Sequence, residues 1–349
     1  MIKSTQKHWS VREAVPDDLP NLRNLYKQVW GYNRPEAYDR WRYLLPPHGL
    51  CPIMLALDAD RLVGAYTLWP VRLKIGDEVV FGAQSMDTMT HPDYQGQGIF
   101  TRLATACFEL AVSRGIEVLY GFPNPKSYPG FVGKLDWCHI GDVIHWVRPV
   151  TPSGIDMIPT FAGSLVDLFT QMLPRGGGGR FLLSYQPPDD QELWRLFEEW
   201  PFHNQRCAIF RSQDWIRWRY DPNCPMEYEW ISAFDGAGHL AACAVWGMHG
   251  SLWGGVADNR AHLTELLGTN QLALRAVLAE VISKAHARRA LVLETLTNNP
   301  IVESVLRRAL AYRHRRAPMI VKVLTNRTLP VDVLELDNWS IIGGDIDTF

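Results

Sequence analysis

The pattern of hydrophobic and polar positions over residues 1–150 switches repeatedly between the period of a strand and the period of a helix. Alternating or continuously apolar runs predict strands at Ser10–Val15, Ile53–Leu57, Leu62–Leu73, Val79–Thr90, Val118–Phe122 and His139–Val147. Apolar residues at helical spacing predict helices at Leu19–Val29, Glu36–Leu45 and Ile99–Arg114, and a short helix after Asn124. The order β-α-α-β-β-β-α-β-α-β indicates an α/β fold, with a mixed central sheet and one strand–turn–helix step in its middle.

The second half of the chain repeats this pattern more faintly. It predicts helices at Gln191–Trp200, Asn270–Arg288 and Asn299–Leu310, and strands at Glu227–Phe234, His239–Trp246, Ser251–Ala257, Ala290–Thr295 and Met319–Leu324. The dipeptides Asn124-Pro125 and Asn299-Pro300 each follow a buried strand and each precede a short helix. This correspondence predicts an internal repeat, with the second half as a degenerate copy of the first.

Four segments follow from these patterns. Residues 1–150 form a first domain and residues 191–330 a second, which suits a chain of 349 residues. Residues 151–190 are interpreted as a linker that holds a short apolar helix near 160–173 and a run of four glycines at 176–179. Residues 331–349 form a C-terminal tail, expected as a surface strand, with a segment that reaches the cleft of the first domain as the alternative.

Composition narrows the class of partner. The net charge of −2 and the pI of about 6.6 provide no basic field for nucleic acid or an anionic membrane. The six cysteines contain no CxxC pair, and no stretch has the apolar run of a signal peptide or a membrane span. We therefore expect a soluble cytoplasmic protein without a metal centre. Its 14 tryptophans are interpreted either as core and interface anchors or as walls of an acceptor pocket.

The residues most indicative of chemistry are Gln95-Gly96-Gln97-Gly98, between the strand that ends at Thr90 and the helix that begins at Ile99. The first turn of a helix has unpaired N–H groups and the positive end of the helix dipole, so it attracts phosphate. Glycine lets the backbone approach an anion without a Cβ between them. The stretch therefore predicts a phosphate-binding turn.

These residues resemble motif A of the GNAT superfamily, Q/R-x-x-G-x-G/A. Gln95 and Gly98 match, while Phe100 replaces the final small residue. The resemblance implies a GNAT-type fold, and a turn of Gln95, Gly96, Gln97, Gly98, Ile99 and Phe100 that binds the pyrophosphate of acetyl-CoA or another acyl-CoA. It also implies that the backbone of Met89 and Thr90 meets the pantetheine arm. The second half lacks such a glycine pair, so we expect no CoA site there.

The same resemblance proposes catalytic groups. Asp87 lies on the strand that enters the turn and is the candidate general base, with a structural carboxylate as the alternative. The family's acid is a tyrosine in N-x-x-A-x-x-x-Y, and counting from Asn124 places Phe131 at that position. Tyr128 is the nearby candidate acid, with packing or pocket lining as the alternative. Asn124 is expected to hydrogen-bond pantetheine or the backbone of the splayed strands.

These expectations describe an N-acyltransferase that moves an acyl group, acetyl in the first instance, from CoA to an amine of a small molecule or amino sugar by direct attack. One alternative is an acyltransferase or thioester-processing enzyme whose donor is held by an acyl carrier protein. Another is a non-catalytic acyl-CoA-binding protein, which the phenylalanine at the tyrosine position favours.

Overall fold

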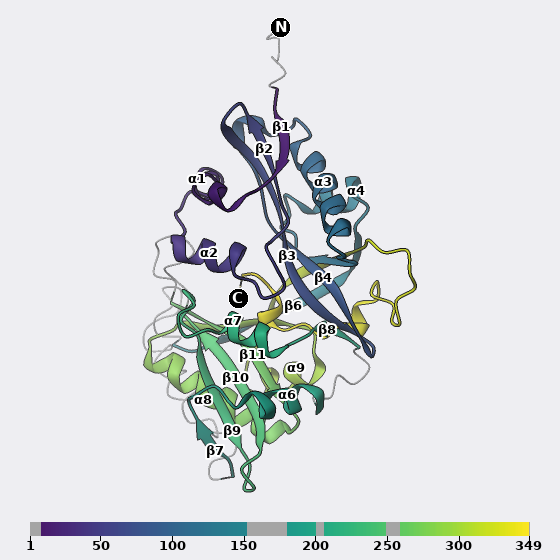
Figure 1. The fold of residues 1–349 in the computed structure, drawn as a ribbon. Coiled ribbons are helices and arrows are strands. Elements are labelled where there is room, and N and C mark those ends of the chain that lie inside the picture. The colour runs from purple at the N-terminus through teal and green to yellow at the C-terminus, as the bar shows by residue number, and fades with distance from the viewer. Residues whose placement is uncertain (1–7, 152–179, 200–205, 249–258, 349) are drawn as a thin grey trace. The chain divides into compact units, whose positions relative to one another are not determined.

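The computed structural model describes residues 8–151, 180–199, 206–248 and 259–348 (Figure 1). They fall into two compact units. The first unit contains Met1–Gly141 and Pro318–Leu334, and the second contains Asp142–Ala317 and Glu335–Phe349.

The first unit is a mixed sheet with helices on both faces. Its strands lie in the order β1-β2-β3-β4-β5-β13, antiparallel except for the parallel pair β4 and β5. In Figure 1, α1 and α2 lie on one side of this sheet and α3 and α4 on the other. The elements are β1 (Ser10–Glu13), α1 (Leu19–Trp30), α2 (Glu36–Leu44), β2 (Ile53–Asp58), β3 (Arg61–Ile75), β4 (Glu78–Thr90), α3 (Ile99–Ser113), β5 (Val118–Gly121), α4 (Tyr128–Lys134) and the end of β13 (Tyr312–Val323).

The second unit has the same arrangement. Its strands lie in the order β7-β9-β10-β11-β12-β6, and only β11 and β12 are parallel. The elements are β6 (Cys138–Pro149), β7 (Leu182–Ser184), α6 (Asp190–Glu199), β8 (Cys207–Ile209), α7 (Gln213–Arg219), β9 (Glu229–Phe234), β10 (Leu240–Gly247), β11 (Arg260–Gly268), α8 (Gln271–Ala287), β12 (Val292–Thr297) and α9 (Pro300–Arg308).

The two units match element by element, with one exchange. Residues Ile320–Val323 of β13 pair with β5 of the first unit, although they come from the second half of the sequence. Residues Ile144–Pro149 of β6 pair with β12 of the second unit, although they come from the first half. Each unit therefore takes its last strand from the other half of the chain.

The structure divides the chain differently from the four predicted segments. Residues 142–149 belong to the second unit and residues 318–334 to the first, because each strand pairs with the other half. Strand β7 of the second unit lies inside the predicted linker. A strand, β11, lies between the predicted strand at 251–257 and the predicted helix from Asn270, where the sequence pattern predicted no element. The expected helix at 160–173, the glycines at 176–179 and the expected strand at 251–257 lie outside the described residues.

The C-terminal tail also differs from its prediction. Trp339, Ile341 and Ile346 are at most 3% exposed, so these residues belong to a core and not to a surface strand. Five of the six cysteines are buried, whereas Cys138 is exposed.

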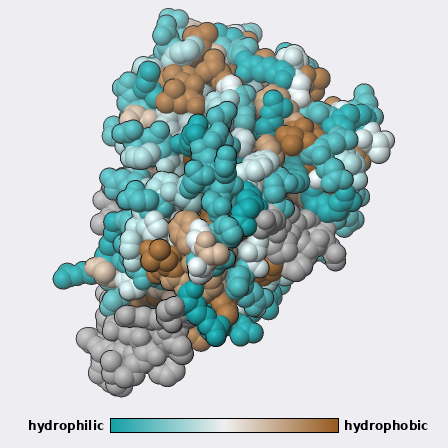
Figure 2. Space-filling model, turned by 60° about the horizontal axis from the view of Figure 1, so that its bottom comes forward, coloured by the Kyte–Doolittle hydropathy of each residue, from teal (hydrophilic) through white to brown (hydrophobic). Residues whose placement is uncertain are grey.

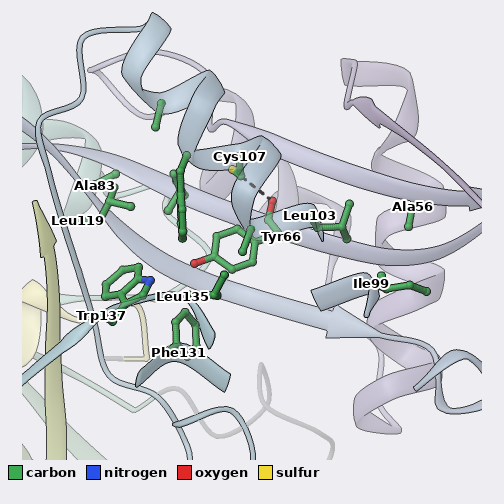
Figure 3. Packing of buried hydrophobic residues seen from close by; sticks show 14 of the residues in the cluster. Ala56, Tyr66, Ala83, Ile99, Leu103, Cys107, Leu119, Phe131, Leu135 and Trp137 are labelled. Atoms are coloured by element: carbon green, nitrogen blue, oxygen red, sulfur yellow. Dashed lines mark hydrogen bonds between the residues drawn. The ribbon is translucent and has the colours of Figure 1, made fainter. Parts of the chain in front are cut away.

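The core of the first unit joins α3 to the sheet. Tyr66 of β3 lies beside Cys107 of α3 (Figure 3). The rings of Phe131 and Trp137 pack edge to face, with their centroids 5.3 Å apart. The apolar face of α3 thereby fixes the helix whose first turn was predicted to bind phosphate.

Hydrophilic residues predominate on the face shown in Figure 2, where hydrophobic residues form separate patches. None of the helices among the described residues has the length and apolar character needed to cross a membrane.

Candidate active site

The glycine turn before α3 has the backbone that its sequence predicts. Gly96 and Gly98 both have φ +77°, a left-handed conformation that favours glycine. Gly98 is the N-cap of α3, and a Cβ built on either glycine meets no heavy atom within 4 Å. The turn is therefore open on the side where side chains would otherwise project.

The backbone amides of this turn are available to a ligand. The first bond of α3 runs from the N–H of Arg102 to the carbonyl of Gly98 at 3.1 Å. Across the described residues, the amides of residues 96–101 donate to no protein acceptor. Clustered free amides at the positive end of a helix form an anion site, so the turn fits a pyrophosphate.

Phe100 leaves this space clear. The centroid of its ring lies 5.2 Å from that of Phe131 and 6.2 Å from that of Tyr66. The ring also covers Gly130, because a Cβ added to Gly130 would lie 2.7 Å from it. The departure from the small residue of motif A is therefore absorbed by the core, while the amide of Phe100 stays in the turn.

Strands β4 and β5 separate next to the turn. Their parallel pairing runs from Gly82–Val118 to Ser85–Gly121, and within the described chain β5 pairs with no later residue of β4. Met89 and Thr90 pair only with Ala65 and Gly64 of β3. Their other backbone edge therefore faces the gap, which fits an extended pantetheine arm.

Asp87 lies on a bulge of β4. The register shifts between Ala65, which faces Met89, and Thr67, which faces Met86, so Asp87 and Thr88 together oppose Tyr66. Asp87 has φ +43°, a strained value for a residue with a side chain. The bulge lies just past Ser85, where β4 and β5 stop pairing.

Three donors hold the Asp87 carboxylate. Its Oδ2 accepts from Arg34 Nη1 at 2.8 Å, Arg42 Nε at 3.1 Å and the Tyr43 hydroxyl at 2.6 Å. Both arginines are buried, and Arg34 also contacts Asp39 at 3.0 Å. Asp39 is also contacted by Arg23 at 3.0 Å, so the two carboxylates are held by three arginines.

This environment changes the interpretation of Asp87. Burial alone would raise the pKa of Asp87, but the charges of Arg34 and Arg42 hold that pKa well below its ordinary value. A carboxylate with so low a pKa is a weak proton acceptor at neutral pH. The structure therefore favours the structural alternative over the general base.

Tyr128 has a partner that its sequence pattern does not indicate. Its hydroxyl lies 3.0 Å from Nδ1 of His139, and Nε2 of His139 lies 3.0 Å from the carbonyl of Gly141. A carbonyl only accepts, so Nε2 carries a proton and Nδ1 faces the phenol. Tyr128 begins α4 and lies two residues before Gly130, which contacts Phe100 of the glycine turn.

Asn124 has a local role. Its Oδ1 accepts from the N–H groups of Lys126 at 2.9 Å and Ser127 at 3.0 Å, so the side chain closes the turn that leads into α4. These bonds occupy the oxygen that was expected to meet pantetheine.

The sequence contains a further signal for the Asp87 cluster. Arg40-Trp41-Arg42-Tyr43 recurs as Arg217-Trp218-Arg219-Tyr220, and each copy has a further arginine, Arg34 or Arg211, eight residues before its last arginine. In the second unit, Arg211 and Tyr220 bond Glu265, at 3.1 and 2.6 Å. Asp87 and Glu265 each lie three residues before the end of their strands, β4 and β11.

The helix that corresponds to α3 in the second unit begins differently. Oδ1 of Asn270 accepts from the N–H of Leu272 at 2.7 Å and from that of Ala273 at 3.4 Å, so a side chain occupies the first amides of α8. An added Cβ on Gly268 would lie 2.8 Å from Ala242, so this glycine is packed, unlike Gly96 and Gly98.

Metal ligands do not gather anywhere in the part of the chain that the structure describes. No group of three or more His, Cys, Asp or Glu side chains is placed there to hold an ion.

Part of the chain matches a known protein family. Residues 10–140 match a family model described as an acetyltransferase (GNAT) domain. No curated protein matches the chain.

Solved structures match almost the whole chain. A probable N-acyltransferase from Enterococcus faecalis, a conserved protein of unknown function, is 11% identical with a TM-score of 0.65, over 91% of this chain and 73% of that one. A tandem GNAT protein of the clavulanic acid biosynthesis pathway is 12% identical with a TM-score of 0.59, over 92% of this chain and 100% of that one. The glucosamine N-acetyltransferase region of a fungal multi-domain beta-N-acetylglucosaminidase is 14% identical with a TM-score of 0.61. The match covers 90% of this chain and 38% of that one.

At these identities the solved structures establish the fold, and the family model establishes the domain that contains the glycine turn. Residues 10–140 therefore carry a GNAT domain, and the two units of the chain share their fold with solved GNAT proteins, one of them a tandem GNAT protein.

Proposed function

We propose that this protein is an N-acyltransferase that moves an acyl group, acetyl in the first instance, from CoA to the amine of a small molecule. The observation that carries the proposal is the open turn before α3, where Gly96 and Gly98 leave the amides of residues 96–101 without a protein acceptor. The gap between β4 and β5 then directs an extended pantetheine towards the bulge at Asp87.

In this proposal the amine attacks the thioester carbonyl directly. Asp87 does not take the amine proton, because Arg34, Arg42 and Tyr43 already hold its Oδ2 and its pKa is lowered. The acceptor therefore enters as the neutral amine, and its surplus proton passes to water after attack. Asp87 acts as a positioning residue that fixes the bulge beside the thioester.

Tyr128 and His139 then serve the leaving group. Attack breaks the C–S bond, and the thiolate takes the hydroxyl proton of Tyr128. Solvent returns a proton to Tyr128. His139 holds the tyrosine hydroxyl through Nδ1 at 3.0 Å, while its Nε2–H donates to the Gly141 carbonyl. The pair replaces the tyrosine that the family pattern would place at Phe131.

The test is turnover of acetyl-CoA against a panel of small amines that includes glucosamine, followed by release of the CoA thiol. We expect one or more amines to be acetylated, with kcat/KM rising with pH as the amine loses its proton. Tyr128→Phe should lower kcat at least tenfold while donor affinity stays unchanged.

Other results would select the alternatives. Turnover only with a phosphopantetheinyl carrier protein would identify a carrier-bound donor. Tight CoA binding without turnover of any amine would identify an acyl-CoA-binding protein and contradict the proposal.

A further inference from the structure

The C-terminal tail is hydrogen-bonded to the second unit through its main chain. The hydroxyl of Thr297 donates to the carbonyl of Ile341 at 2.7 Å, and the N–H of Ile341 donates to Asn298 Oδ1 at 2.9 Å. Ser340 bonds Asn299 through its side chain at 3.0 Å and the carbonyl of Cys207 through its N–H at 2.8 Å. These partners lie on β8, at the end of β12 and at the start of α9.

The place that the tail fills corresponds to the gap in the first unit. The parallel pairing of β11 with β12 stops at His262–Glu294, as that of β4 with β5 stops at Ser85–Gly121. Beyond this point the tail bonds the end of β12 and then packs against β11 with the short turn Gly343–Asp345.

The tail also completes the second copy of the arginine cluster. In the first unit Arg34 contacts two carboxylates, Asp87 and Asp39. The residue at the position of Asp39 in the second copy is Ile216. Asp345 replaces the missing acid: its Oδ1 accepts from Arg211 Nη2 at 2.7 Å, beside Glu265.

The fit is close at the turn. An added Cβ on Gly344 would lie 2.5 Å from Glu265 Oε1 and 2.6 Å from the Tyr220 hydroxyl, and both atoms are buried and hydrogen-bonded to each other. Only a residue without a side chain passes this point.

We propose that residues 335–348 of the C-terminal tail permanently occupy the gap between β11 and β12, which corresponds to the gap between β4 and β5. Asp345 takes the place of the acid that the repeat lost at Ile216. The second unit is thereby a filled site. The proposal stands on the tail's own contacts, so it survives if the first unit uses another donor.

Burial of apolar side chains contributes most of the stability of the packed tail. Trp339, Ile341, Ile342 and Ile346 are all at most 3% exposed. Burial of such apolar side chains removes them from water and stabilises the packed tail. Asp345 contributes orientation more than energy, because burial and the nearby Glu265 raise its pKa to about 6 against the attraction of Arg211.

The experiment is hydrogen–deuterium exchange on the full-length protein. We expect the amides of Ile341 and Ile342, which donate to Asn298 and Asp345, to exchange as slowly as the amides of β11. In Gly344→Ala the added methyl meets Glu265 and Tyr220, so these two amides should exchange at least tenfold faster. Asp337→Ala, an exposed acid of the same tail, is the matched control and should leave them protected.

Exchange of Ile341 and Ile342 within seconds in the unaltered protein would overturn the proposal, and this result does not depend on whether the variant folds. Full protection in a folded Gly344→Ala would also contradict it. Donor binding by the first unit serves as the separate readout and should be unaffected in Gly344→Ala.

Discussion

The helices α3 and α8 occupy the same place in two matching units, yet they begin in opposite ways. Two left-handed glycines open the start of α3 and leave its amides free, whereas Asn270 caps α8 with its own side chain. Beside each helix the strand retains a carboxylate that is bonded by an arginine and a tyrosine. The repeat therefore kept the cluster that supports the bulge and lost the turn that binds an anion.

The second difference is what lies in each gap. In the second unit, the gap between β11 and β12 holds the tail. The Asp87 side chain is 10% exposed, whereas its counterpart Glu265 is fully buried. The comparison indicates that one cluster supports an accessible site and the other supports a packed core.

The largest effect is expected from removing the exchanged strand. A chain that ends at Pro149 lacks Ile320–Val323 and leaves β5 with an unpaired edge, so it should be insoluble or unfolded. Soluble yield and circular dichroism measure this. Appending residues 318–324 through a flexible linker should recover folded protein. A stable truncated chain with normal donor affinity would contradict the strand exchange.

The next prediction distinguishes a structural role of Asp87 from a catalytic one. Asp87→Asn removes a buried negative charge from Arg34 and Arg42, and Glu265→Gln removes one from Arg211. Losses of this kind cost about 3–5 kcal/mol. We expect both variants to unfold at lower denaturant concentration by similar amounts. If Asp87→Asn instead keeps full stability and loses kcat at least a hundredfold, Asp87 is the base after all.

Acid should weaken both units. The pKa of Asp87 is lowered by Arg34 and Arg42, and the hydrogen bond from His145 helps to lower the pKa of the buried Glu294 to about 2. Carboxylates with depressed folded-state pKa values stabilise above their unfolded values, near 4, and this stability is lost as the pH falls. For Glu294 the loss is on the order of 3 kcal/mol.

Denaturant titrations between pH 7 and pH 2 measure this loss. Glu294→Gln should flatten the pH dependence below pH 4.5. An unchanged slope in that variant would show that Glu294 does not contribute.

The smallest effect concerns the cap of α8. Asn270→Ala removes the bonds to Leu272 and Ala273 and should cost about 1 kcal/mol. It should create no second CoA site, because the tail still fills the gap. Calorimetry that finds two CoA molecules per chain in this variant would show that the cap alone kept the second unit closed.

The sequence predicted the elements near strong local patterns and missed features that depend on distant pairing. The strand–turn–helix at Gly96 and Gly98 was predicted, because glycine and the helix start are local signals. The exchange of β6 and β13 was not, because each strand has the same alternating pattern whichever sheet it joins. Asp87 was placed correctly on the strand, but its partners Arg34 and Arg42 lie 53 and 45 residues away.

One missed feature had a signal in the amino-acid sequence. The repeated Arg-Trp-Arg-Tyr aligns the two halves of the chain and marks the position of both clusters. The role of the tail had no such signal, because nothing in Asp345 or Gly344 alone indicates a partner at Arg211 or Glu265.

The central claim is that the open turn at the start of α3 binds the acyl-CoA donor. The most direct measurement compares acetyl-CoA affinity by calorimetry in Gly98→Val and Gly115→Val. Both glycines have similar left-handed φ values, +77° and +78°, and open space around an added Cβ, but they lie at opposite ends of α3. The account predicts one CoA per unaltered chain, and at least tenfold weaker binding, about 1.4 kcal/mol, in Gly98→Val alone. Equal affinity in the two folded variants would contradict it.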